Sequence, residues 1–242
     1  MKKLISTLLI ITIFSTMFSV HSFSFNVGAV MYPANETHTI VDVPRNCWYY
    51  PAFVFCHDHN LMTPTVIKTE IDPYGPHYYT EMFYGDRNIT RAEIVTILSR
   101  YNWSRRLPST APAFVDVPDG LWYTGNAQWA YDNGIVNGVG GAYFAPERTI
   151  TREEFAAMLY RYTNYLEVDT SARADFSAFA DSDSVSSWAT DAMSWAVAEG
   201  LISGKPGNLL APQDTITRAE VAVIIYRFNN EVKAFWDLRD GK

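Results

Sequence analysis

Internal repetition is the feature that most constrains this chain. Residues 112–164 and 177–230 are two copies of one unit, and residues 40–101 form a more divergent third copy. The motifs, seen fully in two copies and partly in the third, are Phe-x-Asp, a tryptophan, a turn of the type Gly-Ile-x-x-Gly, Phe-x-Pro, and a closing Ile-Thr-Arg-x-Glu. Units this short cannot bury their own apolar stripes, so the three copies are expected to pack together.

Each copy first predicts a helix with apolar positions at 0, +4, +7 and +8, one face of a 3.6-residue period. The helix is expected to end at a residue that tolerates the left-handed conformation. The one polar exception is Asn126. The members are Trp48, Ala52, Phe55 and Cys56, ending at Asn60; Trp122, Asn126, Trp129 and Ala130, ending at Gly134; and Trp188, Ala192, Trp195 and Ala196, ending at Gly200.

A second helix in each copy is announced by a capping box, Thr-x-x-Glu, at Thr90–Glu93, Thr151–Glu154 and Thr217–Glu220. An apolar stripe follows each box. The loop within Thr63–Met82 of the first copy is longer than its counterparts, and Pro64, Pro73, Gly75 and Pro76 predict an irregular excursion there. The expected fold is therefore all-α, with three helix-loop-helix repeats and a short tail over residues 231–242.

The N-terminus has the pattern of a secretory signal. Lys2 and Lys3 precede an uncharged apolar run from Leu4 to Val20. A signal peptide over residues 1–22 is predicted, with cleavage as late as residue 29 an alternative, and a retained membrane helix a second one. The formal charge is −7, and removal of residues 1–22 takes away two lysines and no acid, leaving −9. Such a charge disfavours nucleic acid and anionic membranes as partners.

The ordered motifs resemble the S-layer-homology family over roughly residues 40–230. The resemblance implies a pseudo-threefold bundle with ligand grooves between neighbouring repeats. It also implies a secreted protein at the cell wall or cell surface, which binds secondary cell-wall polysaccharide without a covalent bond. That glycan is anionic and commonly carries a pyruvate ketal. In some bacteria with an outer membrane, similar modules tie that membrane to the wall.

Three arginines, Arg91, Arg152 and Arg218, stand at the first position of the second helices. A cation there opposes the helix dipole at a cost of about 0.3–1 kcal/mol, so three recurrences suggest a compensating partner. One interpretation is a carboxylate receptor made of the guanidinium and free backbone N–H groups. The other is an ion pair with an acid of the same or a neighbouring repeat, such as Asp42, Asp116 or Asp181.

Other candidate glycan-binding residues are Trp122 and Trp188, with Trp48 at the same position, because an indole stacks on a sugar face; they also head an apolar stripe and suit a core. Gly138 and Gly204 would let the backbone approach a ligand, although a turn alone explains them. Asp116 and Asp181 complete the set. In the first copy, Pro64 replaces the turn glycine, so its groove is expected to be altered or closed. One or two working sites are expected.

Sequence signals for disulfides, metal binding and catalysis are weaker. Helical spacing puts the Cα atoms of Cys47 and Cys56 about 13 Å apart, so free thiols are predicted. His57 and His59 would point to different sides of a helix end, and no metal is expected. No nucleophile motif or phosphate loop is present, so neither enzymatic activity nor a cofactor is expected. The rival interpretation is a module with decayed glycan sites that binds another surface protein through Thr63–Met82.

Overall fold

The computed structural model describes residues 36–72, 77–102, 106–108 and 113–239, with the side chains of 233–239 left aside. The predicted signal peptide lies outside these residues. Within them, no helix is long and apolar enough to cross a membrane. Each repeat contributes two α-helices: α2 (Tyr50–Asp58) and α3 (Arg91–Tyr101), α4 (Thr124–Asp132) and α5 (Arg152–Tyr165), and α6 (Thr190–Ala198) and α7 (Arg218–Arg239), with the 3₁₀ turn η1 (Ser182–Ser184) before α6.

The structure confirms the predicted start signals of the second helices and the predicted stop signals of the first helices. Thr90 and Thr151 cap α3 and α5 in complete capping boxes, and Thr217 exchanges the same two bonds with Glu220 at α7. The turns after α2, α4 and α6 contain the left-handed residues that the sequence indicated. Their φ angles are 53° at Asn60, 69° at Gly134 and 63° at Gly200. Local chemistry therefore sets where these helices start and stop.

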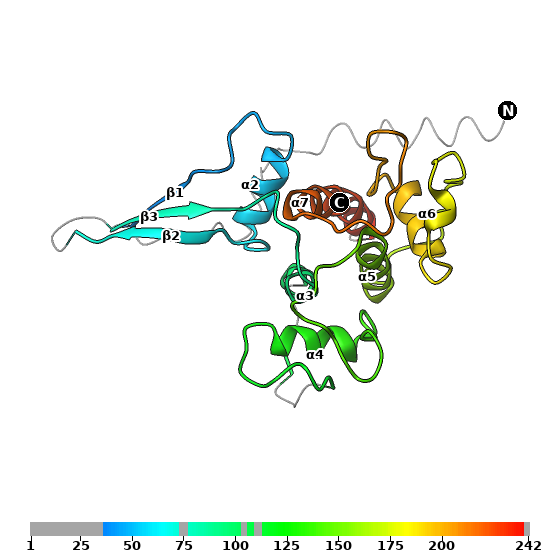
Figure 1. Cartoon of the computed structure of the whole chain (residues 1–242), viewed down its shortest axis with the longest axis horizontal. Helices are drawn as coiled ribbons and strands as arrows, with labels where there is room; N and C mark the ends of the chain where they lie inside the picture. Colours follow the sequence, from blue (N-terminus) through cyan, green and yellow to red (C-terminus); the bar gives the residue numbers. More distant parts are fainter. Residues whose placement is uncertain (1–35, 73–76, 103–105, 109–112, 240–242) are drawn as a thin grey trace, which may run out of the picture.

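The helices pair across repeats instead of within them. The first helix of each repeat packs on the second helix of the preceding one: α4 on α3, α6 on α5, and α2 on α7. The last of these pairs joins the two ends of the repeat array. Figure 1 shows α3, α5 and α7 grouped at the centre, with α2, α4 and α6 outside them. A repeat removed from this ring would lose the helix that covers its own apolar stripe.

A closed ring of backbone hydrogen bonds marks the centre. Ile89 N–H donates to Ile216, Ile216 N–H to Ile150, and Ile150 N–H to Ile89, each at 3.1 Å. All three side chains are fully buried. At the opposite ends of α3, α5 and α7, the rings of Tyr101, Tyr162 and Phe228 lie 5.7–6.2 Å apart. Since equivalent residues meet at both ends, the three central helices run parallel around a pseudo-threefold axis.

The polar residue in the predicted stripe, Asn126, is buried and fully engaged. Its amide oxygen accepts from the Ser99 hydroxyl at 2.6 Å, and its amide nitrogen donates to the Thr96 hydroxyl and the Trp122 carbonyl at 3.1 Å. Because Thr96 and Ser99 belong to α3, this cluster links α4 to the helix it packs on. A satisfied buried amide tolerates desolvation and fixes which helix α4 meets.

The all-α prediction is wrong. The protein also contains a mixed sheet of β1 (Glu36–Ile40), β2 (Thr65–Glu70) and β3 (His77–Met82), in the order β1-β3-β2. β1 pairs with β3 in parallel, and β2 pairs with β3 antiparallel. The loop predicted to be irregular is thus largely a pair of strands. Its prolines and glycine fall before and between two runs rich in β-branched and aromatic residues, which favour pleated backbone.

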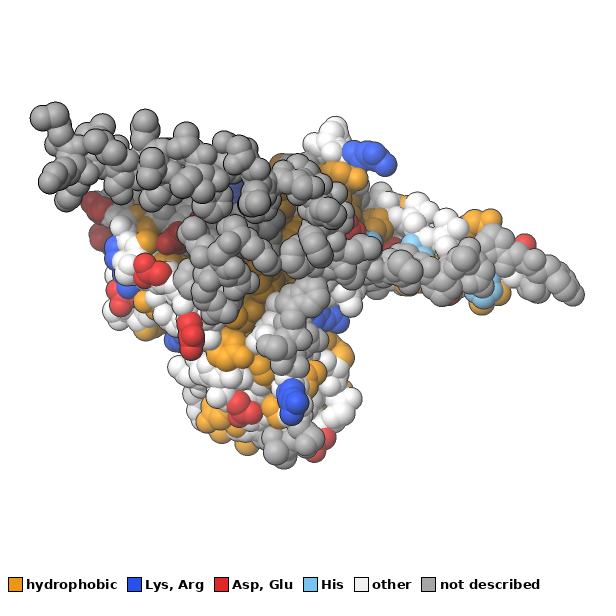
Figure 2. Space-filling model, turned by 180° about the vertical axis from the view of Figure 1, so that it is seen from behind, with side chains coloured by type: hydrophobic (Ala, Val, Ile, Leu, Met, Phe, Trp, Pro, Cys, Tyr) orange, Lys and Arg blue, Asp and Glu red, His pale blue; other side chains and the backbone are white. Residues whose placement is uncertain are grey.

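This sheet forms an arm that projects from the helical body (Figure 1). The view from the opposite side shows the same projection, with hydrophobic, uncharged polar and histidine side chains along it and an acidic one near its end (Figure 2). Its position puts the extra residues of the first repeat outside the ring, which explains how the ring closes despite the longer loop.

The tryptophans that head the first helical stripes do not belong to the core. Trp48, Trp122 and Trp188 are 64%, 59% and 55% exposed, and each stands two residues before its helix begins. The following residue is the buried one in all three repeats: Tyr49, Tyr123 and Ala189. The apolar stripe therefore starts one position later than the sequence pattern suggested.

Candidate anion-binding grooves

The three arginines Arg91, Arg152 and Arg218 are buried at the joints between repeats. Each Nε donates to a carbonyl of the next repeat's loop: Phe144 at 2.8 Å, Leu210 at 3.1 Å and Phe83 at 2.9 Å respectively. The guanidinium groups of Arg91 and Arg218 also lie over the rings of Phe144 and Phe83. Each arginine therefore locks one repeat onto the next.

The backbone N–H groups at these helix starts are not free, which contradicts one premise of the anion receptor. The first two N–H groups of each second helix donate to carbonyls of the next repeat's loop. The pairs are Arg91 to Arg148 and Ala92 to Pro146, Arg152 to Asp214 and Glu153 to Pro212, and Arg218 to Arg87 and Ala219 to Gly85, at 2.9–3.0 Å. The helix dipole is thus compensated by peptide carbonyls of the neighbouring repeat.

Each arginine also pairs with an acid, but that acid is a capping-box glutamate and not an aspartate. The guanidinium lies 3.8 Å from Glu154 at Arg91, 3.6 Å from Glu220 at Arg152, and 2.8 Å from Glu93 at Arg218. A second cation holds each glutamate: Arg148 at 2.6 Å, Lys205 at 3.7 Å and Arg87 at 2.5 Å respectively. Every glutamate therefore caps its own helix and receives the arginine of the preceding repeat.

The aspartates predicted near the site hold loop backbone instead of the arginines. Both oxygens of Asp116 accept from the N–H groups of Phe144 and Ala145, at 2.8 and 2.7 Å. Asp181 does the same for Leu210 and Ala211, and Asp42 for Phe83 and Tyr84. These carboxylates fix the carbonyls that receive the arginines, so their role in the site is indirect.

The electrostatics of the joints follow from this burial. Desolvation lowers the pKa of Arg91 to about 10, against the opposing charge of Glu154, so Arg91 stays charged at neutral pH. Burial favours the protonated form of Glu93, but hydrogen bonds from Arg87 and the Thr90 backbone, with the charge of Arg218, outweigh it and lower its pKa. The pKa of Glu154 is lowered in the same way, chiefly through Arg148.

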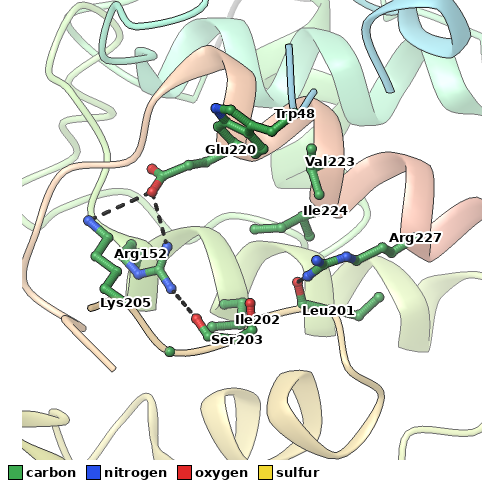
Figure 3. Close-up of a pocket in the computed structure, with 11 residues that line it drawn as sticks. Trp48, Arg152, Leu201, Ile202, Ser203, Lys205, Glu220, Val223, Ile224 and Arg227 are labelled. Carbon is green, nitrogen blue, oxygen red and sulfur yellow. Dashed lines mark hydrogen bonds and ion pairs between the residues drawn. The ribbon is translucent and has the colours of Figure 1, made fainter. Parts of the chain in front are cut away.

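A groove, called groove I, opens beside Arg152, where the loop of the third repeat meets α7. Its volume is about 130 Å³. Figure 3 shows Arg152, Lys205 and Glu220 converging at one end and Arg227 at the other, with Val223 and Ile224 between them. Trp48 comes from the first repeat and covers one side. The lining residues are Trp48, Arg152, Leu201, Ile202, Ser203, Gly204, Lys205, Glu220, Val223, Ile224 and Arg227.

Groove II repeats this construction one joint further on, beside Arg218. The divergent loop of the first repeat leaves it open, with a larger volume of about 310 Å³. Trp122 of the second repeat takes the place of Trp48. The lining residues are Leu61, Met62, Thr63, Pro64, Thr65, Arg87, Glu93, Thr96, Ile97, Arg100, Trp122 and Arg218. The long loop and the proline at the turn therefore alter this groove without closing it.

The predicted glycines serve packing. Gly138 has a φ of +78°, and a Cβ there would lie 2.6 Å from the Tyr143 carbonyl and 2.9 Å from Phe114. A Cβ on Gly204 would lie 2.6 Å from Phe179. The phenylalanine that opens each of these repeats therefore occupies the space a side chain would need. Gly204 lines groove I as well, whereas Gly138 belongs to the third joint, beside Arg91.

Four groove cations were not predicted from the sequence: Arg87, Arg100, Lys205 and Arg227. Arg100 and Arg227 line the grooves, and both donate to loop carbonyls, Arg227 to Gly200 and Leu201. The signal was present: an arginine stands nine residues after the first one in all three second helices, with Arg161 as the third. Lys205 carries no repeat signal, because Thr65 and Val139 take its place in the other loops.

Cys47 and Cys56 are free thiols, as predicted. Burial raises the pKa of Cys56 to about 12. His59 Nδ1 donates to the Phe55 carbonyl at the end of its own helix, at 2.8 Å. Across the described ranges, no group of three or more His, Cys, Asp and Glu side chains could hold a metal ion.

A ring of helix pairs, joined by arginines and hollowed by grooves at its joints, defines a repeat-built binding module. The model of the S-layer homology domain matches residues 113–156 and 178–222. The second and third repeats are thus S-layer homology domains, and the chain is a cell-surface protein associated with the cell wall. The first repeat lies outside the matched residues, yet it supplies the same cap, arginine and glutamate to the ring.

Curated relatives support this assignment. The chain is 31% identical over 186 residues to an amylopullulanase of Thermoanaerobacterium thermosulfurigenes, covering 73% of this chain and 10% of the relative. It is 34% identical over 152 residues to a surface-layer 125 kDa protein of Lysinibacillus sphaericus, covering 61% and 12%. It is 27% identical over 161 residues to a cellulosome-anchoring protein of Acetivibrio thermocellus, covering 64% and 35%. The chain therefore spans only a small part of these relatives' length.

Proposed function

We propose that this protein attaches non-covalently to the cell wall by binding an anionic secondary polysaccharide in grooves I and II. The observation that carries the proposal is the charge of the groove walls. Arg152, Lys205 and Arg227 line groove I with one carboxylate, Glu220. Groove II has the same balance, with Arg87, Arg100 and Arg218 against Glu93. In a chain of net charge −7, such local excess of cations favours an anionic ligand.

The shape of groove I supports a sugar with an acidic substituent. Val223 and Ile224 form an apolar strip between the two cationic ends (Figure 3). Trp48 presents an exposed indole beside that strip, as a sugar face requires. A carboxylate such as a pyruvate ketal would then pair with Lys205, whose side chain is 28% exposed. Arg152, 5% exposed and bonded to two carbonyls, would act from behind through its charge.

The S-layer homology domain is a wall-binding module without catalytic activity, and this is the role proposed for the whole chain. The enzyme-named relatives share with it only a small part of their length. The grooves are therefore proposed to bind polysaccharide and not to catalyse bond cleavage.

Binding to purified wall sacculi tests the proposal. The test variant is the double substitution Trp48→Ala and Trp122→Ala, because both side chains are more than half exposed and their loss should leave the fold intact. Tyr78→Ala, an aromatic 47% exposed on the sheet arm, is the matched control. Wild-type protein and the control should sediment with native sacculi, and the double variant should not.

A second arm identifies the ligand. Sacculi stripped of secondary polysaccharide should bind none of the three proteins, and the released polysaccharide should compete for binding. Chemical removal of its pyruvate ketals should weaken that competition. Equal sedimentation with native and stripped sacculi would overturn the proposal. It would instead favour a protein-interaction module at the cell surface.

A further inference from the structure

The sheet arm ends in an open edge. β2 is one of the two outer strands in the order β1-β3-β2, and all six of its residues are exposed. An edge strand presents unpaired N–H and C=O groups that match those of another strand. Val66 and Ile67 in β2 are 45% and 47% exposed, and Ile71, the residue directly after the strand, is 66% exposed. An apolar strand edge of this kind is a surface that a further strand would complete.

The edge is complementary to itself. In an antiparallel pair of two β2 strands centred on Thr69, each Lys68 faces Glu70 of the other copy. In the same register each Ile67 faces Ile71, and the two Thr69 residues face each other. Opposite charges and apolar pairs directly across strands are the arrangements that stabilise a sheet. The strand is neutral overall, so two copies of it carry no net charge that would repel each other.

Neighbouring registers lack this match. Centring the pair on Lys68 or on Glu70 puts like charges directly opposite each other, which destabilises a sheet. Centring it on Ile67 leaves Lys68 facing Val66. The irregularity in the β2–β3 pairing falls between Val66 and Lys68, so the stretch around Thr69 is regular. Among these registers, only the one centred on Thr69 places Lys68 opposite Glu70 without placing like charges opposite each other; it also leaves Val66 facing Asp72.

We propose that a second copy of this chain occupies the edge, with its β2 antiparallel to the first and a twofold axis through Thr69. The two arms then form one continuous six-stranded sheet between two helical bodies. The arm projects away from the ring (Figure 1), and Thr69 lies about 13 Å along the strand from Thr65, which lines groove II. Groove I has no lining residue on the sheet arm.

Such pairing would make wall attachment bivalent. A six-residue edge gives a weak dimer in free solution, but two bodies bound to one wall hold their arms at high local concentration. The proposal stands on the β2 edge alone and is independent of what the grooves bind.

Disulfide trapping tests the register. In a Cys47→Ser background, Thr69→Cys puts two thiols at a Cα separation of about 4.5–5.5 Å across the twofold axis, which a disulfide spans. Mild oxidation of this variant should give a covalent dimer. Lys68→Cys and Glu70→Cys should give several-fold less, because those thiols lie off the axis. Absence of a covalent dimer in all three, or equal amounts in all three, would overturn the proposal.

Charge exchange provides a test without new thiols. Sedimentation at high protein concentration should show a monomer–dimer equilibrium for the wild type. Lys68→Glu and Glu70→Lys should each weaken it several-fold, and the two variants mixed, or combined in one chain, should restore it. These residues are exposed, so folding is checked by an unchanged thermal midpoint. A wild-type chain that stays monomeric at every concentration, or one that the charge changes do not affect, would overturn the proposal.

Discussion

Arg218 at the start of α7 bonds to Glu93 in α3 at 2.8 Å, although the two residues stand 125 positions apart. This contact joins the third repeat to the first and closes the ring. The equivalent joints, Arg91 with Glu154 and Arg152 with Glu220, link consecutive repeats by the same pair. Each glutamate also caps its own helix. The same side chain therefore starts a helix and binds the arginine of the preceding repeat.

Arg152→Ala is expected to destabilise the protein by about 2–4 kcal/mol, because it leaves Leu210 and Ser203 carbonyls and Glu220 without their buried partner. Lys205→Ala in the same groove should cost less than about 1 kcal/mol, since that side chain is partly exposed. Urea unfolding measures both. Similar losses for the two variants would show that Arg152 is not a structural joint.

Lys205→Ala should nevertheless weaken wall binding, because the proposed ligand carboxylate meets this lysine. The matched control is Arg173→Ala, a cation that is 39% exposed and lies outside both grooves and outside the sheet arm. Sedimentation with native sacculi at several salt concentrations is the measurement, and the wild type should be the more salt-sensitive protein. Unchanged binding by Lys205→Ala would remove this residue from the site.

Gly138→Ala should destabilise the protein by about 1–3 kcal/mol, because the new Cβ meets the Tyr143 carbonyl at 2.6 Å and the backbone φ is +78°. Gly120→Ala is the control, with a similar φ of +83° and no atom within 4 Å of its Cβ. Its cost should be only that of the left-handed backbone, about 1 kcal/mol. Thermal unfolding separates the two; equal losses would show that the close approach contributes nothing.

Thr151→Ala should cost about 1 kcal/mol, because the hydroxyl accepts the Glu154 N–H at the start of α5. Thr151→Ser keeps that hydroxyl and should be nearly neutral. Comparison of their denaturant midpoints tests the capping role. If serine were as costly as alanine, the threonine methyl group and not the cap would account for the loss.

Acid should loosen the ring at the glutamates. The pKa values of Glu93 and Glu154 are lowered in the folded state from the ordinary 4.5. Their stabilising contribution is therefore complete above about pH 4.5 and is lost as the pH falls through the folded values. The thermal midpoint should fall below pH 4.5. A Glu93→Gln, Glu154→Gln variant should start lower and depend less on pH over that range; an unchanged slope would assign the acid sensitivity to other groups.

Local signals in the sequence predicted the helices well. The capping threonines, the left-handed residues Asn60, Gly134 and Gly200, and the free cysteines are all found as expected. Each of these rests on residues close together in the chain. The prediction of an irregular loop was wrong because the run Thr65–Glu70, rich in β-branched residues, favours a strand, and Pro73 and Gly75 lie outside that run. A strand needs a partner, and β1 lies outside that loop.

The same distinction between local signals and long-range partners applies to the site. The sequence by itself determined the recurring arginines, tryptophans and capping glutamates, because repetition exposes any residue that each unit needs. Tertiary structure alone decided what they meet: Arg152 reaches Leu210 and Glu220, and Trp48 of the first repeat enters a groove built by the third. These partners come from ring closure, in which every repeat packs on its neighbours, and no pattern within one repeat encodes that order.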